Sequence, residues 1–316
     1  MKVVKTDGLL EVSPEDLRSF AGLPVDFSER TCLTEDELIE TCRDAAGLLV
    51  LREPLTARVL DALEGCRVIA RFGIGLDSID VPAATARGIR VTHVPAANGV
   101  EVASHAVAMV MALTRRLPGY HAEVAGGGWD FEGPGLGVRR TTEQTAGLLG
   151  FGRIGRRVAA ALAAIGFTVQ AHDPNLPDEA LRAQGIRPVG LEELLAGSDV
   201  LSVHVPLTEA TRDLLDAAAL ARLRPGAVLV NVSRGGIVDE AALAEAVRTG
   251  HLGGAGLDTF AVEPLPADSP LRGVPGILLS PHAAHYSADS YAETRRTAFE
   301  DLARVLRGEE PRFPAN

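Results

Sequence analysis

The chain has 316 residues, 46% hydrophobic and 23% charged, a composition typical of a globular protein of about two domains. Lysine and arginine total 31 against 42 acidic residues, and the net charge of −11 disfavours nucleic-acid binding, which requires a basic face. Lysine occurs only as Lys2 and Lys5, which excludes a P-loop and the Tyr/Lys pair of short-chain dehydrogenases and argues against Schiff-base chemistry.

Three cysteines, Cys32, Cys42 and Cys66, lack the CxxC spacing of metal sites, so we expect reduced, buried thiols in a cytoplasmic protein and no metal. The N-terminus has no apolar core typical of a signal peptide. No segment approaches the roughly 20 uninterrupted apolar residues of a membrane span. We therefore expect no membrane association.

Short β-like runs alternate with helical patterns through the first hundred residues, which predicts a small doubly wound α/β unit with a parallel sheet. The predicted strands are Lys2–Thr6, Gly47–Val50, Val68–Arg71 and Arg90–Thr92. The predicted helices are Pro14–Phe20, Glu35–Cys42, Ala57–Leu63 and Val81–Arg87.

A long apolar stretch, Val100–Arg116, predicts a buried helix, and the glycine-rich stretch His121–Arg140 predicts a flexible connection. A second alternating series follows and predicts a six-stranded dinucleotide-binding sheet. Its strands are Thr145–Leu149, Thr168–His172, Val200–His204, Ala227–Val232, Gly254–Leu257 and Ile277–Ser280. Its helices are Ile154–Ile165, Glu179–Gln184, Leu191–Leu195, Ala217–Ala221 and Glu240–Arg248.

The last amphipathic helix, Ala288–Leu306, is expected to pack back on the first unit and make that domain discontinuous. The predicted fold class is therefore α/β with two doubly wound parallel-sheet domains. We expect residues 1–98 and 286–316 to form a flavodoxin-like domain and residues 99–285 to form a Rossmann domain of the dinucleotide-binding kind.

The clearest motif is Gly150-Phe-Gly152-Arg-Ile-Gly155, which follows an apolar strand and opens a helix. Gly150 permits the tight turn, Gly152 lets the backbone approach a pyrophosphate, and Gly155 allows close helix packing. The N–H groups of Arg153 and Ile154 at the helix start would receive the phosphates.

Asp173 ends the next strand, about 20 residues after the motif, as a ribose-binding acid should. Its carboxylate can accept both ribose hydroxyls of NAD and would repel the 2′-phosphate of NADP. The motif therefore favours NAD over NADP, although Arg153 could partly offset that repulsion.

A cation, a carboxylate and an imidazole follow three strands on the edge where such sheets bind ligands: Arg234, Glu263 and His282. Beside a nicotinamide cofactor they suit carbonyl reduction by hydride transfer. His282 would donate a proton to the forming alkoxide, and Glu263 would orient its ring. Arg234 would bind the carboxylate and carbonyl of a 2-oxo acid in a fork geometry. Asp258 could hold the nicotinamide carboxamide.

These residues and their spacing resemble the D-isomer-specific 2-hydroxyacid dehydrogenases, which include phosphoglycerate, glyoxylate/hydroxypyruvate and D-lactate dehydrogenases. The likeness spans nearly the whole chain, and its most specific segments are RFGIGLDSID, GLLGFGRIG, VHVPLTEATRDLL, NVSRGGIVDE, GAGLDTFAVEP and SPHAAHYS. The resemblance implies two domains around a cleft, an NAD-dependent enzyme of class EC 1.1.1.-, and a homodimer through the NAD domains.

The resemblance also implies the remaining site residues. The catalytic set is Arg234, Glu263 and His282. On the substrate side, the N–H groups of Ile74 and Gly75 would contact the acid, with Asn98 and Val102 nearby. Arg71 would either assist in binding the acid or form a structural salt bridge. His285 would either shape the substrate pocket or lie on the surface. The cofactor wall would comprise His204, Val205, Pro206, Thr211, Val232, Ser233, Asp258, His282 and Ala284.

Some positions depart from the family pattern, such as Ser78 where Asn is common and Ser104 where an acid is common. The segment around His285 is similar to the C-terminal-binding-protein branch, whose members are NAD-sensing corepressors. Two alternatives therefore stand beside a D-2-hydroxyacid dehydrogenase: an NAD(H)-binding regulator without important turnover, and a dehydrogenase of a phosphonate or phosphite anion.

Overall fold

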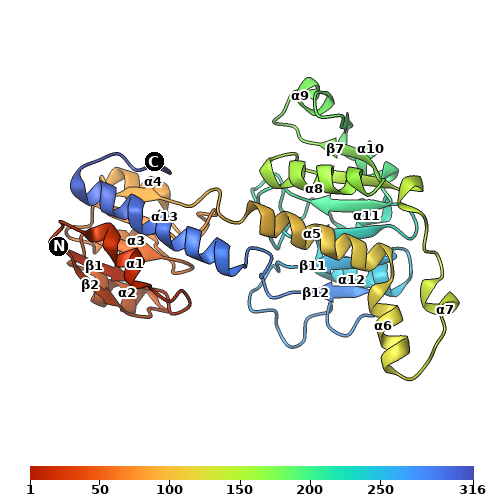
Figure 1. Ribbon diagram of the computed structural model, residues 1–316, viewed down its shortest axis with the longest axis horizontal. Coiled ribbons are helices and arrows are strands. Elements are labelled where there is room, and N and C mark those ends of the chain that lie inside the picture. The colour runs from red at the N-terminus through yellow and green to blue at the C-terminus, as the bar shows by residue number, and fades with distance from the viewer. The chain divides into compact units, whose positions relative to one another are not determined.

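The computed structural model describes residues 1–316, which divide into two compact units (Figure 1). The first comprises Met1–Asn98 and Ser287–Asn316, and the second comprises Gly99–Tyr286. Each is built on one parallel sheet, which confirms the predicted α/β class.

The sheet of the first unit has five parallel strands in the order β2-β1-β3-β4-β5, the flavodoxin-like order. Apolar side chains on its two faces form two separate cores. The strands are β1 (Lys2–Lys5), β2 (Asp26–Glu29), β3 (Gly47–Val50), β4 (Val68–Arg71) and β5 (Arg90–Thr92).

Helices cover both faces of this sheet. The helix α13 (Ala288–Arg307) packs against β3 and β4, and its buried Phe299 contacts the rings of Phe20, Phe27 and Phe72. The C-terminal tail then pairs with the edge of β5, where Ala315 N–H donates to the carbonyl of Val91. The other helices are α1 (Pro14–Leu17), the 3₁₀ turn η1 (Arg18–Phe20), α2 (Glu35–Cys42), α3 (Ala57–Asp61) and α4 (Val81–Ala86).

The second unit has seven parallel strands in the order β12-β11-β10-β9-β6-β7-β8, which is the 3-2-1-4-5-6 order of dinucleotide-binding sheets with one further strand. The strands are β6 (Thr145–Leu149), β7 (Thr168–His172), β8 (Arg187–Pro188), β9 (Val200–Val203), β10 (Val228–Asn231), β11 (Gly254–Leu257) and β12 (Ile277–Leu279). The order reverses between β6 and β9, so a ligand site is expected at their carboxyl ends.

Two apolar cores cover the faces of this sheet, and α5 packs on α8 over one of them. The helices are α5 (Gly99–Thr114), α6 (Leu117–Ala125), α7 (Glu132–Gly135), η2 (Thr141–Glu143), α8 (Arg153–Ala164), α9 (Asp178–Arg182), α10 (Leu191–Gly197), α11 (Ala217–Ala221) and α12 (Glu240–Arg248).

Three expectations were wrong in detail. In the first unit, the strand β2 was not predicted because its sequence, DFSE, is that of a polar edge strand. In the second unit, β8 was not predicted because it is only two residues long, so that sheet has seven strands and not six. The stretch His121–Arg140, predicted as a flexible connection, contains most of α6 and all of α7. Pro118 lies in the first turn of α6, where proline is tolerated, and does not break the helix.

Candidate active site

The turn between β6 and α8 can be made only by glycine at two positions. Gly150 has φ +96°, and a Cβ there would lie 2.8 Å from the backbone of His204. A Cβ at Gly155 would overlap the carbonyl oxygen of Gly150, so this glycine lets the helix sit directly on the turn. The predicted roles of these two glycines therefore have a steric basis in the fold.

The same turn fits an anionic dinucleotide. No heavy atom lies within 4 Å of where a Cβ of Gly152 would stand, so this backbone faces open space. Gly152 is the N-cap residue of α8 and provides no side-chain acceptor for the first N–H groups of the helix. The uncapped positive end of a 12-residue helix beside open space suits a pyrophosphate.

Asp173 lies against this turn. Its Oδ2 accepts the N–H of Phe151 at 2.8 Å, and its Oδ1 accepts the N–H of Asn175 at 3.0 Å. Each carboxylate oxygen has two lone pairs, so both can still accept a ribose hydroxyl. The geometry is compatible with the predicted ribose-binding role.

The predicted adenine wall begins at the end of β9. The backbone of His204 and the Cγ1 of Val205 lie 2.8 and 3.0 Å from the Cβ position of Gly150. Thr211 closes the following loop, since its hydroxyl donates to the carbonyl of Pro206 at 2.6 Å. His204, Val205, Pro206 and Thr211 therefore form one connected segment beside the glycine turn.

His204 is not an acid for catalysis. Burial lowers its pKa to about 4, because the charged imidazolium loses its hydration. Its Nε2 lies 2.9 Å from the hydroxyl of Ser202, and its buried Nδ1 has no hydrogen-bond partner. A neutral ring here agrees with the prediction of a wall residue.

The turn after β10 holds Arg234 by its backbone. The Asn231 amide donates to the carbonyl of Arg234 at 2.8 Å and accepts the N–H of Ser233 at 3.0 Å. The Ser233 hydroxyl donates to the Val203 carbonyl at 2.7 Å, which ties the turn to β9. The Arg234 guanidinium donates to the Ser233 carbonyl at 2.8 Å. Asn231 was not among the predicted residues, although an amide inside an apolar strand was a signal of such a role.

His282 and Glu263 form a direct pair. The ring Nδ1 of His282 lies 2.7 Å from Oε2 of Glu263, and Oε1 of Glu263 accepts the N–H of Phe260 at 3.0 Å. A carboxylate is an acceptor only, so it holds Nδ1 as the donor and leaves Nε2 as the ring atom that can face a reactant. The side chains of His282 and Glu263 are 31% and 30% exposed, so both remain accessible.

The Arg234 turn adjoins this pair. A Cβ at Gly235 would overlap the carbonyl carbon of Phe260, so the turn packs directly on the loop that carries Glu263. Because β10, β11 and β12 are neighbouring parallel strands, their carboxyl ends lie at one edge of the sheet. The fold thus brings the loops of Arg234, Glu263 and His282 together.

The residues flanking His282 are fixed by Asp258. His282 has a left-handed backbone, φ +54°, and its N–H donates to the Asp258 carbonyl at 2.8 Å. The Asp258 carboxylate is 1% exposed and accepts the N–H groups of Ala283 and Ala284. Its contact with a nicotinamide carboxamide stays a prediction. The ring of His285 meets that of His282 edge-on, with centroids 5.8 Å apart.

Three apolar residues that were predicted to contact the cofactor or the substrate have side chains that lie mostly inside the core. Val232 and Ala284 are buried, and Val102 packs partly buried against the same core cluster. Contacts of Val232 and Ala284 with a ligand would therefore involve mainly their backbone. These roles also stay predictions.

The predicted substrate loop follows β4 in the first unit. Gly73 has φ +141° and lies under the guanidinium of Arg71, which a Cβ at Gly73 would overlap. The Ile74 carbonyl lies 3.0 Å from Nδ1 of His93, which fixes the loop next to Gly75. Asn98 ends this part of the first unit, and its Oδ1 is buried without a hydrogen-bond partner.

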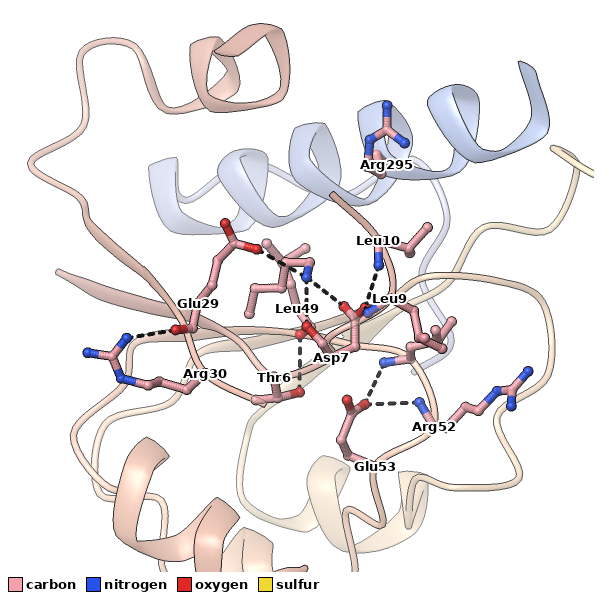
Figure 2. A network of polar contacts seen from close by, with 12 residues as sticks. Thr6, Asp7, Leu9, Leu10, Glu29, Arg30, Leu49, Arg52, Glu53 and Arg295 are labelled. Carbon is pink, nitrogen blue, oxygen red and sulfur yellow. Dashed lines mark hydrogen bonds and ion pairs between the residues drawn. The ribbon is translucent and has the colours of Figure 1, made fainter. Parts of the chain in front are cut away.

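Loops at the carboxyl ends of β1 and β3 are held by a buried polar network (Figure 2). Asp7 accepts two backbone N–H groups of its own loop and lies 3.3 Å from Nζ of Lys5. Lys5 also lies 3.2 Å from Glu29, and the carboxylate of Glu53 accepts the N–H of Arg52 at 2.9 Å. Lys5 is 1% exposed and thus has a structural role, as its predicted place in a first strand suggests.

No cluster of three or more His, Cys, Asp or Glu side chains is arranged to hold a metal ion. None of the helices combines the length and the apolar character needed to span a membrane.

Comparison with protein families places a match on residues 107–284, which fit the family model described as "D-isomer specific 2-hydroxyacid dehydrogenase, NAD binding domain". This match confirms the predicted resemblance and the prediction of NAD as the cofactor. It covers the glycine turn, Asp173 and the loops of Arg234, Glu263 and His282.

Individual proteins are similar over most of the chain. D-3-phosphoglycerate dehydrogenase of Mycobacterium bovis is 39% identical over 279 residues, which are 87% of this chain and 52% of that protein. Glyoxylate reductase of Korarchaeum cryptofilum is 36% identical over 87% of this chain and 83% of its own length. This chain thus spans about half the length of the phosphoglycerate dehydrogenases that it matches.

A solved structure has the same fold. D-lactate dehydrogenase from Aquifex aeolicus, complexed with NAD and lactic acid, superposes with a TM-score of 0.86. It is 28% identical, and the match covers 98% of this chain and 96% of that one.

The low pKa of His204 predicts a loss of stability in acid. In the unfolded state the pKa of His204 is near 6.5, and in the folded state it is about 4. Between these two pH values the unfolded state binds a proton that the folded state does not, so the free energy of unfolding falls as the pH drops through this window. From pH 7 to pH 5 the free energy of unfolding should decrease by about 2 kcal/mol from this residue. Urea unfolding of the wild type and His204→Gln at both pH values measures it. An equal decrease in both proteins would contradict the prediction.

Proposed function

Since the chain belongs to the D-isomer-specific 2-hydroxyacid dehydrogenase family, we propose that it is an NAD-dependent oxidoreductase that interconverts a D-2-hydroxy acid and its 2-oxo acid. The observation that carries the proposal is the 2.7 Å contact between His282 and Glu263 next to the Arg234 turn. His282 is the proposed proton donor and Arg234 the proposed cation, and both lie on the unit that contains the glycine turn.

Proton transfer is assigned to His282. When bound, the reduced nicotinamide supplies the hydride. The protonated imidazole of His282 donates its Nε2 proton to the substrate oxygen, which becomes the hydroxyl, and takes it back in the oxidative direction. Glu263 stays ionised, keeps Nδ1–H as its donor and stabilises the imidazolium.

Substrate binding is assigned to cations and backbone donors. The Arg234 guanidinium binds the carboxylate and the carbonyl oxygen, and its local charge offsets the repulsion of an anion by a chain of net charge −11. The N–H groups of Ile74 and Gly75 bind the carboxylate, and Arg71 assists. His285, with its ring against that of His282, borders the reacting carbon.

The two units take separate tasks in this proposal. Residues 1–98 and 286–316 bind the acid, and residues 99–285 bind NAD. The relatives are named for phosphoglycerate and glyoxylate, and the solved neighbour holds lactic acid, so the substrate is a small 2-hydroxy or 2-oxo acid. The three free cysteines support a reducing compartment such as the cytoplasm.

We also propose a homodimer through the NAD-binding unit. The arm at residues 117–138 exposes large apolar side chains, and α6 buries none of its nine residues. A short helix without a buried face gains little stability by itself, so a second copy of the arm is its proposed partner. The exposed side chains are Leu117, Val124, Trp129, Phe131 and Leu136.

The first prediction from the proposed function concerns turnover. With NADH and a panel of 2-oxo acids, the wild type should oxidise NADH, and His282→Asn, which tolerates the left-handed backbone, should lower kcat by about 10²–10⁴. His251→Asn, distant at the start of β11, is the control. Tight NADH binding without turnover would favour the regulator, and turnover only with phosphite or a phosphonate would favour the second alternative.

The second prediction concerns cofactor choice. Asp173→Ala removes the carboxylate that repels a 2′-phosphate, so the ratio of kcat/KM for NADH to that for NADPH should fall by about tenfold or more. Asp178→Ala, an exposed carboxylate paired with Arg182 on α9, should leave the ratio unchanged. An unchanged ratio in Asp173→Ala would remove it as the ribose acceptor.

The third prediction concerns assembly. The wild type should sediment at twice the 33.2 kDa chain mass, and a Trp129→Ser/Phe131→Ser variant should shift toward the monomer, because it removes two exposed rings from the arm. Leu33→Ser, equally exposed but in the first unit, is the matched control. A monomeric wild type at micromolar concentration would refute the dimer.

A further inference from the structure

Asp258 is a buried carboxylate, and both of its oxygens accept hydrogen bonds from residues on either side of His282. Its Oδ1 accepts the N–H of Ala283 at 2.8 Å and the hydroxyl of Ser280, and its Oδ2 accepts the N–H of Ala284 at 2.9 Å. Ser280 lies two residues before His282, and Ala283 and Ala284 directly follow it. A single carboxylate therefore holds both sides of the turn that carries the proposed acid.

A histidine on the helix α5 extends this hydrogen-bond network beyond the turn. Nε2 of His105, on α5, lies 2.9 Å from Oγ of Ser280 and 3.7 Å from Oδ1 of Asp258. The carboxylate can only accept, so the Ser280 hydroxyl must donate its hydrogen to Asp258, and the Ser280 oxygen must accept a hydrogen bond from Nε2–H of His105. The direction of the chain is thus Nε2–H of His105 to Ser280 to Asp258.

We propose that His105 is a positioning residue for the reaction, acting through Ser280 and Asp258 on the backbone of His282. This inference rests on the proposed function. The left-handed backbone of His282 is disfavoured for a residue with a side chain, so it persists only where neighbouring bonds hold it. The tether from α5 supplies such a bond from outside the turn.

The tether has the features expected of a positioning device. His105 is 30% exposed, while Asp258 is 1% exposed, so the chain runs from the surface of α5 to a carboxylate beneath the turn. Loss of the donor would leave Ser280 free to rotate away and would loosen one of the three bonds on Asp258. The His282 ring would then hold its alignment with Glu263 less well.

The experiment compares three single variants and one double variant. His105→Leu and Ser280→Ala should each lower kcat by about tenfold to a hundredfold, as small misplacements of reacting groups do, with NADH affinity near that of the wild type. His105→Gln retains an N–H donor and should restore most of the rate. The double variant should fall no further than the worse single variant, because both changes break one path.

A measurement independent of turnover accompanies the kinetics. Hydrogen exchange of the peptide spanning residues 280–286 should speed up about tenfold in His105→Leu and Ser280→Ala, and should stay near the wild type in His105→Gln. His251→Leu, which removes a half-buried imidazole with one hydrogen bond at the amino end of β11, should change neither readout.

The outcomes separate the two proposals. Unchanged exchange in His105→Leu, or equal damage in His105→Leu and His105→Gln, would overturn the positioning role whatever the activity. If the wild type reduced no 2-oxo acid, the proposed function would fail, while the exchange data would still decide whether His105 holds the turn.

Discussion

The hydrogen bond between Nδ1 of His282 and the Glu263 carboxylate is the constraint on which the rest of the site depends. It determines which ring nitrogen is left without the carboxylate, and it keeps a negative charge beside the ring that would become an imidazolium in the proposed reaction. Glu263 can do this because its second oxygen is held by the N–H of Phe260. The loop of Phe260 in turn touches Gly235, so the cation-bearing turn of Arg234 is positioned by the same packing.

Two histidines at the carboxyl edge of one sheet show how environment separates roles. His204 follows β9, and burial lowers its pKa to about 4, so its ring is neutral near neutral pH and is poorly suited to act as a general acid. His282 follows β12, is 31% exposed and has a carboxylate partner. Only the second combination suits acid–base work, although both residues come after strands and look alike in the sequence.

The main elements were predictable because apolar runs and helical patterns mark them clearly. The strands Gly47–Val50, Thr145–Leu149 and Gly254–Leu257 have the predicted bounds. Polar or very short strands such as Asp26–Glu29 carry no such pattern, because their stability comes from pairing with β1 and not from their own side chains. The helix at Leu117–Ala125 was hidden by a proline and a glycine in its first turn.

The sequence patterns assign the candidate site residues to loops that follow strands, but they do not indicate which way each side chain turns. A polar residue that follows a strand can reach outward to a ligand or turn inward to hold a loop, and the sequence is the same in both cases. Burial makes the distinction: Asp258 is 1% exposed and bonded to its own turn, whereas His282 reaches the surface. The partner that completes the inward set, His105, is 175 residues from Ser280 in the chain, so no local spacing pattern could connect them. In our proposal His105 and Ser280 affect the reaction by holding the backbone of the turn, and three-dimensional contacts were needed to identify them.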